Sequence, residues 1–344
     1  MYKRQGKGLP AAENDPTSYH GIKGKVGYEP ETQAPSYTKV YGKLITDLGR
    51  KNDKVLTITA AMCDGTGLNE FRDTFPSRYF DVGIAEGHAV TFAAGLAAKG
   101  FRPVVSIYST FLQRAIDSII HDVSLQHLPV IFAIDRGGLV GEDGPTHHGI
   151  FDLSYLSMIP DVVLSAPKDG NELRDLLHTA LTVIDKPFFI RYPRDHSVRF
   201  DENANPKILP IGSWEILQEG KKLAVIATGA MIEEAEQALE LLKADGISPT
   251  LVNARFIKPL DTKILEKLAD EHKTVLIIEE NVPTGGLASA VMWHLQQNNI
   301  KVKIATMSLP DGYVTHGARV QILEDAGLSY RAIAKKIRKI LNKE

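Results

Sequence analysis

The sequence predicts an α/β fold of two doubly wound domains, preceded by a linker strap. Short, fully apolar runs alternate with amphipathic stretches, a pattern typical of parallel sheets that are covered by helices on both faces. A polar segment at 201–206 separates two such series. The chain has 344 residues, more than the roughly 250–300 at which a single hydrophobic core usually stops growing. We therefore expect domains at residues 39–200 and 207–344.

Residues 1–38 do not have the pattern of a folded domain. They are rich in glycine and proline and contain few apolar runs, which is typical of a linker or of a strap that lies over another surface. A free-standing protein has little reason to begin with such a segment. We therefore expect that another segment once preceded it.

In the first domain, strands are expected where apolar residues follow one another, and helices where they recur with a helical period. The expected strands are 55–59, 103–108, 130–134, 162–165 and 188–192. The expected helices are 86–98, 111–125 and 171–184.

The second domain repeats this alternation without a residue-level repeat. Its expected strands are 223–227, 249–252, 275–279 and 304–307, with helices at 232–243 and 330–344. The last helix is basic, which suits the negative end of a helix and a solvated face better than membrane binding.

Composition excludes several classes of protein. The net charge is -2, so the chain lacks the basic field that nucleic-acid binding requires. Cys63 is the only cysteine, so no intramolecular disulfide can form, and a reducing, cytoplasmic location is expected. No run approaches about 18 apolar residues, and the N-terminus lacks the apolar core of a secretory signal.

The candidate site residues lie near expected strand ends, because ligands of open α/β sheets bind beyond the carboxyl ends of the strands. Glu86 follows a strand-like run and is either a helix-start acid or a carboxyl group aimed at a ligand nitrogen. Tyr108 and Phe111 lie at the next strand end. They are either core residues or a surface on which a flat ring stacks.

The loop at 135–149 combines glycines, charges and two histidines, as functional loops often do. Arg136 could bind a phosphate, and a histidine could transfer a proton near neutral pH. A metal site is the rival interpretation. We disfavour it because His147 and His148 are adjacent and tend to point apart.

The segment 191–194 follows the last strand of the first domain and carries two arginines. These suit either an anionic substrate or a surface ion pair. Together with the preceding stretches, they indicate an enzyme site for a phosphorylated small molecule.

The same stretches resemble the 1-deoxy-D-xylulose-5-phosphate synthase family. The resemblance is carried by 36–42 (SYTKVYG), 79–95 (YFDVGIAEGHAVTFAAG), 107–114 (IYSTFLQR), 143–147 (DGPTH), 151–156 (FDLSYL) and 191–194 (RYPR). The strap resembles the family's interdomain connection, and the second domain is similar to a transketolase C-terminal domain. Each motif is moderately specific, but the ordered set is highly specific and covers essentially the whole chain.

The resemblance implies a thiamine-diphosphate-dependent transferase. The family joins pyruvate to D-glyceraldehyde 3-phosphate with loss of CO2, in the non-mevalonate isoprenoid pathway. Glu86 would hydrogen-bond the aminopyrimidine ring and stabilise the imino tautomer, whose nitrogen takes the thiazolium C2 proton. Tyr108 and Phe111 would line the pyrimidine pocket.

The resemblance also assigns residues to the substrates. Arg136 and Arg194 would bind the phosphate of the acceptor aldehyde. Arg114, Asp143 and His147 would surround the reacting centre, where His147 would either transfer a proton or hold a carboxylate. A homodimer is expected because enzymes of this kind are usually dimers.

Three positions depart from the family's pattern. Gly87 stands where glutamine is usual, which removes a polar contact near the cofactor and loosens the helix start. Leu9 stands where an aromatic residue is usual, so a cofactor contact there is in doubt. Asp195 replaces a usual glycine, and a carboxylate beside a phosphate site would weaken anion binding.

The family's diphosphate-binding motif is missing from the sequence. That motif is a Gly-Asp-Gly stretch, followed roughly thirty residues later by asparagines that hold Mg²⁺ on the diphosphate. Neither 64–65 nor 143–144 leads into such asparagines, and the pair at 298–299 lies in the second domain. We therefore expect no metal ligands here, Mg²⁺ ligands from a domain absent from this chain, and no turnover by the chain alone.

Two origins would explain a missing domain. The chain is either a fragment of a longer enzyme or one subunit of a split enzyme whose partner binds the diphosphate. The linker-like start favours the fragment.

Other functions remain open. The chain could be the C-terminal subunit of a split transketolase or a 2-oxo-acid dehydrogenase β chain, although 143–147 with Arg194 suits a short phosphorylated aldehyde. A dehydrogenase β chain would instead need a surface for a lipoyl-carrying partner. Gly87, Leu9 and Asp195 favour a non-catalytic assembly subunit, but the intact candidate site argues against it.

Overall fold

The computed structural model describes residues 6–15, 19, 34–183, 185–197 and 199–342, and divides into two units, 1–33 and 34–344. In the first unit, helix α1 (Pro10–Asn14) begins with a proline, which suits the first helical position. Leu9 precedes it and is 48% exposed. Residues 1–5, 16–18 and 20–33 of the expected strap lie outside the described residues.

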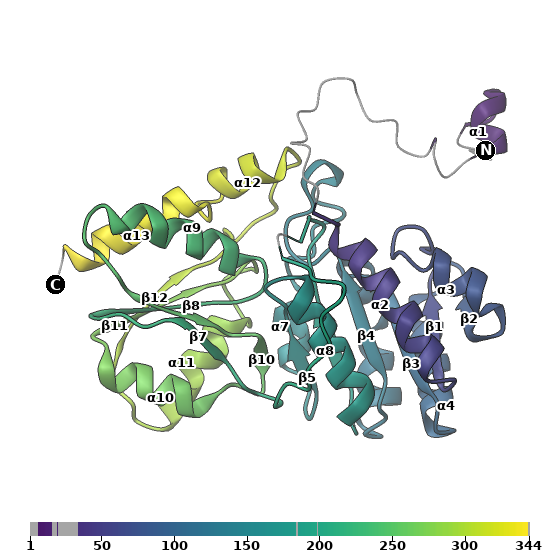
Figure 1. The fold of residues 1–344 in the computed structure, drawn as a ribbon, viewed down its shortest axis with the longest axis horizontal. Helices are drawn as coiled ribbons and strands as arrows, with labels where there is room; N and C mark the ends of the chain where they lie inside the picture. The colour runs from purple at the N-terminus through teal and green to yellow at the C-terminus, as the bar shows by residue number, and fades with distance from the viewer. Residues whose placement is uncertain (1–5, 16–18, 20–33, 184, 198, 343–344) are drawn as a thin grey trace. The chain divides into compact units, whose positions relative to one another are not determined.

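A seven-stranded sheet in the second unit has the order β10-β5-β6-β4-β3-β1-β2 (Figure 1). Its strands are β1 (Val55–Thr59), β2 (Tyr79–Asp81), β3 (Arg102–Tyr108), β4 (Ile131–Asp135), β5 (Val163–Ser165), β6 (Phe188–Arg191) and β10 (Phe256–Lys258). Strands β1 to β6 are parallel, and β10 is antiparallel to β5. The chain adds β2 on one side of β1 and β3 on the other. This reversal of strand order creates the crevice in which ligands of such sheets bind.

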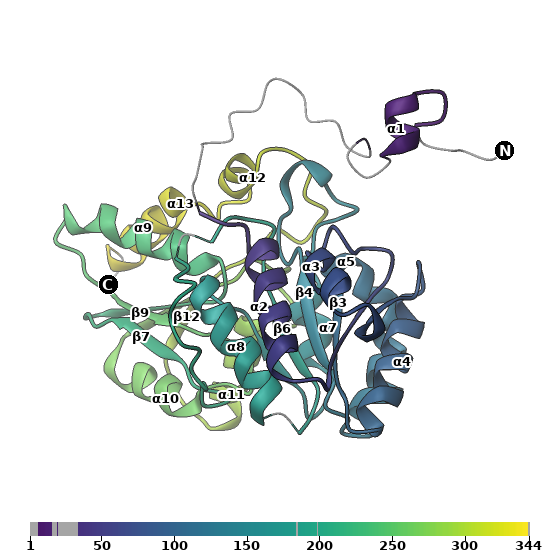
Figure 2. The same ribbon diagram turned by 45° about the vertical axis from the view of Figure 1, so that its right-hand side comes forward.

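Helices cover both faces of this sheet (Figures 1 and 2). On one face, α2 (Tyr37–Lys51) and α8 (Gly170–Val183) pack on Val104 and Ile131. On the other, α4 (Glu86–Ala98) and α7 (Asp152–Ser157) pack on Val105 and Phe132. Neighbouring strand residues thus belong to opposite faces, as the apolar runs predict. Helix α3 (Asn69–Thr74) follows β1.

The prediction of one continuous helix over 111–125 is wrong. The chain forms α5 (Ser109–Leu112), a 3-10 turn (Gln113–Ala115), α6 (Ile116–Ser118) and a π-helical turn (Ile119–Ser124). Such changes of helix type occur where tertiary contacts override local preference. Here Arg114, in the 3-10 turn, contacts Glu86.

The second sheet has the order β12-β11-β8-β9-β7. Its strands are β7 (Glu215–Gln218), β8 (Leu223–Ala227), β9 (Thr250–Asn253), β11 (Thr274–Ile278) and β12 (Lys303–Met307). Its helices are α9 (Met231–Lys243), α10 (Thr262–Glu271), α11 (Leu287–Gln297), α12 (Arg319–Asp325) and α13 (Tyr330–Leu341). Helices α9 and α13 lie on one face, and α10 and α11 on the other (Figure 1). The predicted fold class, two doubly wound α/β domains, is confirmed.

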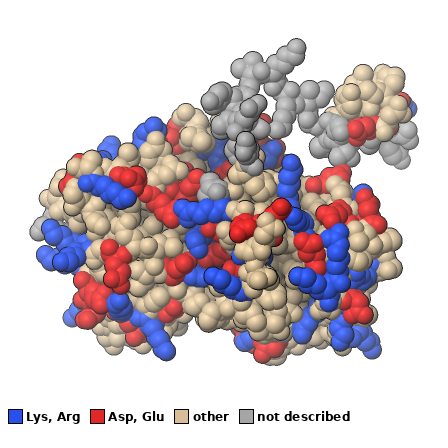
Figure 3. All heavy atoms as spheres, viewed as in Figure 1, with Lys and Arg blue, Asp and Glu red and all other residues tan. Residues whose placement is uncertain are grey.

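The basic helix α13 does not present an apolar face. Ile333, Ile337 and Ile340 are buried against the second sheet, so its cations occupy the exposed side. Cations and acids are interspersed on the face seen in Figure 3. Over the described part of the chain, we find no helix of the length and apolarity needed to span a membrane.

Strand β10 extends the first sheet with residues from the second half of the chain. The backbone N–H of Ala166, just after β5, donates to the carbonyl of Arg255 at 2.9 Å. The indole N–H of Trp214 donates to the carbonyl of Phe256 at 2.8 Å. The two halves therefore share one sheet, which the sequence did not predict.

Candidate active site

Glu86 lies at the switch point of the first sheet, where it is the first residue of α4. Its carboxyl group is buried and accepts a hydrogen bond from Nη1 of Arg114 at 2.6 Å. The positive end of the helix favours an anion at this position. The structure therefore places a buried carboxyl group, held by one arginine, just beyond β2.

An aromatic surface lies at the end of β3. The rings of Tyr108 and Phe111 are stacked, with centroids 5.7 Å apart and planes inclined by 14°. His147 meets the Phe111 ring edge to face at 5.5 Å, and the guanidinium carbon of Arg114 lies 5.3 Å from its centroid. Tyr108 is buried, which raises the pKa of its hydroxyl and keeps it neutral. Phe111 is partly exposed and offers a flat surface.

Arg136 lies behind this surface. Its guanidinium carbon is 3.9 Å from the centroid of the Tyr108 ring. Its Nη1 contacts the buried carboxylate of Asp135 at 3.2 Å and the carbonyl of Gly65 at 3.4 Å. Only 15% of the side chain is exposed, so in this arrangement it supports Tyr108. Its assignment to a phosphate stays a prediction.

Gly65 is a close neighbour of Tyr108 that the sequence did not single out for this role. A Cβ atom at this position would lie 2.0 Å from the Tyr108 hydroxyl oxygen and 2.9 Å from Cζ. Only glycine therefore lets the loop after β1 approach the aromatic surface this closely. The signal in the sequence was a glycine in a polar loop, which is too common to be diagnostic.

The adjacent histidines point apart, as the sequence predicts. His148 is buried, and its Nδ1 accepts from the N–H of Val140 at 3.1 Å. Its Nε2 lies 3.3 Å from the carbonyl of Thr315 in the second domain. Burial lowers the pKa of His148, which keeps it neutral. His147 instead contacts Thr146 Oγ1 through Nδ1 at 2.8 Å and faces the aromatic surface.

Arg194 and Asp143 form an accessible pair beside this loop. Nη1 of Arg194 lies 2.6 Å from Oδ2 of Asp143 and donates to the carbonyl of Val140 at 3.0 Å. More than a third of each side chain is exposed. Arg194 is therefore accessible to solvent, with its charge paired to that of Asp143.

Arg191 differs from Arg194 although both follow the same pattern in the sequence. Its side chain is 4% exposed, and its Nε lies 3.1 Å from the buried carboxylate of Asp152. Its Nη2 donates to the carbonyls of Gly149 and Glu280 at 3.2 and 2.8 Å. Arg191 therefore joins the two domains, and the hypothesis that it binds an anionic substrate is wrong.

Two of the departures from the family's pattern have clear surroundings. A Cβ atom at Gly87 would have only Ser118 Oγ near it, at 3.6 Å, and α4 begins at Glu86 regardless. The carboxylate of Asp195 is bound by Arg319 of the second domain at 2.9 Å. Asp195 is thus not a free carboxylate beside Arg194. Arg319 itself was missed, because nothing near it in the sequence indicates this contact.

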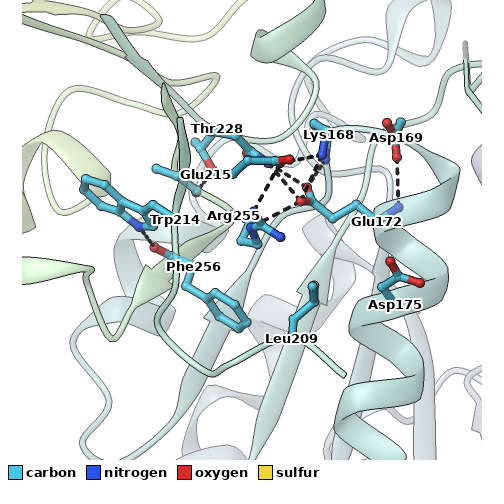
Figure 4. A network of polar contacts seen from close by, with 12 residues as sticks. Lys168, Asp169, Glu172, Asp175, Leu209, Trp214, Glu215, Thr228, Arg255 and Phe256 are labelled. Atoms are coloured by element: carbon cyan, nitrogen blue, oxygen red, sulfur yellow. Dashed lines mark hydrogen bonds and ion pairs between the residues drawn. The ribbon is translucent and has the colours of Figure 1, made fainter. Parts of the chain in front are cut away.

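A separate cavity of about 390 Å³ lies between α8 and the second domain. Oxygen atoms of Glu172 accept from the backbone N–H of Lys168 at 2.7 Å and from the side-chain amide of Asn253 at 2.9 Å. Glu215 pairs with Lys168 at 2.8 Å and with Arg255 at 3.1 Å (Figure 4). Lys168 and Glu172 of the first domain thus contact Glu215 and Asn253 of the second, so the cluster joins the two domains. Its opposite charges offset one another. In the part of the chain described, no cluster of three His, Cys, Asp or Glu residues is arranged to hold a metal ion.

Comparison with known proteins identifies both domains. Residues 33–198 match the family model "Transketolase, pyrimidine binding domain", and residues 212–333 match "Transketolase, C-terminal domain". A 1-deoxy-D-xylulose-5-phosphate synthase of Dictyoglomus thermophilum is 50% identical over 339 residues, which are 98% of this chain and 54% of that protein. The chain belongs to the transketolase-like family that includes these synthases. The resemblance noted in the sequence is confirmed.

The synthase of Aquifex aeolicus is 45% identical over 348 residues, covering 99% of this chain and 55% of that protein. The chain thus spans about half the length of the curated relatives that it matches.

Solved structures agree on the fold. A protein described as "Split gene transketolase, inactive beta4 tetramer" has a TM-score of 0.78 and 28% identity, and the match covers 90% of this chain and 99% of that one. A transketolase from Pichia stipitis has a TM-score of 0.72 and 17% identity, covering 91% of this chain and 46% of that one. The second match shows the fold alone.

Proposed function

We propose that this chain forms the pyrimidine-binding and acceptor-binding part of a 1-deoxy-D-xylulose-5-phosphate synthase. The reaction is the thiamine-diphosphate-dependent condensation of pyruvate with D-glyceraldehyde 3-phosphate, with loss of CO2. The observation that carries the proposal is the buried carboxyl group of Glu86 beside the aromatic surface of Tyr108 and Phe111. It lies within the domain that matches the pyrimidine-binding model.

The residues present fit the aminopyrimidine ring. Glu86 would hydrogen-bond a ring nitrogen, and Arg114 holds the carboxylate in place for this contact. Phe111 would stack on the ring, with Tyr108 and Arg136 supporting it from behind. Thiamine diphosphate, when bound, supplies a nucleophilic carbon at the thiazolium ring. Glu86 would promote this by favouring the tautomer that accepts the thiazolium proton.

The acceptor would bind on the loop side of the site. Arg194 is accessible and cationic, so it would bind the phosphate and share or exchange its contact with Asp143. His147 contacts Thr146 through Nδ1, so Nε2 is the nitrogen that would exchange a proton or hold the carboxylate of pyruvate. Arg136 would add to the positive field from behind Tyr108.

The diphosphate and its Mg²⁺ would bind to a diphosphate-binding domain in the same assembly. The two family models that the chain matches are the pyrimidine-binding and C-terminal domains, and the matched relatives are about twice as long. We further propose that the chain acts in an assembly of at least two copies, because the split-gene transketolase that it resembles is described as a tetramer.

A second candidate is the corresponding subunit of a split transketolase, which the 99% coverage of the split-gene protein supports. The higher identity to the synthases, 45 to 50%, favours the first candidate. The donor substrate separates the two. A synthase uses pyruvate, whereas a transketolase uses a ketose phosphate.

The test is to titrate thiamine diphosphate and Mg²⁺ into the purified chain, alone and with a diphosphate-binding domain. Formation of deoxyxylulose phosphate from pyruvate and glyceraldehyde phosphate is then measured. We expect product only with the added domain, and none when Glu86→Ala is used. Product from the chain alone would contradict the need for that domain. No product from folded protein in either mixture would contradict the proposed function.

A further inference from the structure

Arg319 of the second domain connects two loops of the first domain through one guanidinium group. It is the first residue of α12, and 14% of its side chain is exposed. Nη1 donates to the carbonyl of Leu139 at 2.7 Å, and Nε lies 2.9 Å from Oδ2 of Asp195. Nη2 lies 2.9 Å from the carboxylate of Glu280. All three nitrogens of the guanidinium group therefore have partners.

Glu280 completes the attachment of Leu139. Its Oε1 accepts from the N–H of Leu139 at 2.8 Å, so the Arg319–Glu280 pair holds both polar atoms of that peptide residue. A Cβ atom at Gly138 would lie 2.5 Å from the Glu280 carboxylate, so the loop approaches closely because this residue is glycine. The Glu280 carboxylate is 1% exposed, so its contacts with Leu139 and Arg319 are shielded from water.

The two attached loops are those that set the position of Arg194. Arg194 donates to the carbonyl of Val140, which immediately follows Leu139. Its own backbone immediately precedes Asp195, which Arg319 holds from the other side. Arg319 thus holds Asp195, which is next to Arg194 in the chain. It also holds Leu139, which is next to the residue whose carbonyl orients the Arg194 guanidinium group.

We propose that Arg319 is a positioning residue that holds Arg194 in place to bind the acceptor phosphate. This inference rests on the proposed function. Arg319 does not bind the phosphate itself, because only 14% of its side chain is exposed and all three of its guanidinium nitrogens already have partners. Asp195, expected from the sequence to weaken anion binding, instead serves the site by binding Arg319.

The test measures binding of glycerol 3-phosphate, an unreactive analogue of the acceptor, to the purified chain by titration calorimetry, with glycerol as the uncharged comparison. Arg194→Met removes the phosphate contact and should weaken binding by about 10- to 100-fold, as charged hydrogen bonds do. Arg319→Lys keeps a cation beside Glu280 but cannot reach both loops with one amino group. We expect it to weaken binding by about 3- to 10-fold.

The decisive measurement is the double variant Arg194→Met with Arg319→Lys. If Arg319 acts through Arg194, the double variant binds no more weakly than Arg194→Met alone. The same additional loss in both backgrounds would overturn the inference. The matched control is Arg338→Lys. Arg338 lies on α13 and forms an exposed ion pair with Asp245, so this change should not affect binding.

The two levels of the proposal fail in different ways. If glycerol 3-phosphate does not bind, or if Arg194→Met binds it normally, the proposed acceptor site is wrong. If Arg194→Met weakens binding but Arg319→Lys does not, only the role of Arg319 is wrong. Should Arg319→Lys fail to fold, Asp195→Asn decides, because Asp195 is 43% exposed and its loss breaks only one of the two attachments. Unchanged binding by that variant would overturn the inference.

Discussion

Replacing Arg191 by methionine tests whether its buried cation joins the two domains. The guanidinium group pairs with Asp152 at 3.1 Å and donates to two carbonyls, one of them that of Glu280 in the second domain. Methionine keeps much of the apolar volume but removes every one of these contacts. The variant leaves Asp152, which is 0% exposed, as a buried charge without its cation.

The size of the effect follows from this burial. Removing one partner of a buried ion pair typically costs about 3–5 kcal/mol of unfolding free energy. Asp152 keeps hydrogen bonds from Ser109 Oγ and from the N–H of Leu153, both at 2.9 Å, so we expect the lower part of that range. At about 2–4 °C per kcal/mol for a large domain, the unfolding midpoint should fall by roughly 6–14 °C.

Two further variants make this a matched experiment. Arg191→Met with Asp152→Asn removes both charges and should recover part of the loss, because no buried charge is left unpaired. Arg338→Met breaks an exposed pair whose side chains are 43% and 42% exposed, and should cost less than about 1 kcal/mol. Midpoints are measured by circular dichroism. If Arg191→Met shifts the midpoint no more than Arg338→Met, the assignment of Arg191 to the interface is wrong.

Three other predictions concern the site. Glu86→Gln, assembled with a diphosphate-binding domain, should slow hydrogen exchange at C2 of bound thiamine diphosphate by about 10²- to 10⁴-fold, measured by NMR, and an unchanged rate would exclude its role. Gly65→Ala should displace the Tyr108 ring and lower the free energy of unfolding in urea by about 1–3 kcal/mol. Gly87→Ala should leave this free energy unchanged or raise it, and equal effects of the two changes would refute the packing argument. Burial lowers the pKa of His148, so its contribution to stability is complete above about pH 6.5 and is lost as the pH falls. The difference in midpoint between the protein and His148→Gln should therefore shrink from pH 7 to pH 5, and a constant difference would contradict this.

The parts of the fold that follow from local pattern were predicted well. The strands at 55–59 and 223–227 and the helix at 86–98 have the expected bounds, because apolar runs and helical periodicity are strong there. Strand β10 has three residues and forms only because β5 lies beside it, so no pattern in its own sequence could indicate it. The broken helix after Tyr108 likewise depends on tertiary contacts, including that of Arg114 with Glu86.

The candidate site shows the same division. Glu86, Phe111 and His147 lie near one another, as residues at adjacent strand ends of a parallel sheet should. The different surroundings of Arg191 and Arg194 could not be predicted, because Arg191 ends strand β6 while its buried partner, Asp152, lies 39 residues earlier on helix α7. Arg319 lies 124 residues from Asp195 in the sequence, and only the packing of the two domains brings them together.

The shared strand β10 has a consequence for how the molecule can be divided. Without β10, β5 would be an edge strand with unpaired N–H and C=O groups. Such an edge can pair with a strand of another chain and cause aggregation. A cut in the polar segment at 201–206, where the family models suggest a natural boundary, would create that border. We therefore expect the isolated first domain to aggregate through this edge. A shortened protein that keeps both domains should not aggregate in this way. The two domains should therefore be kept together in any shortened version of this protein.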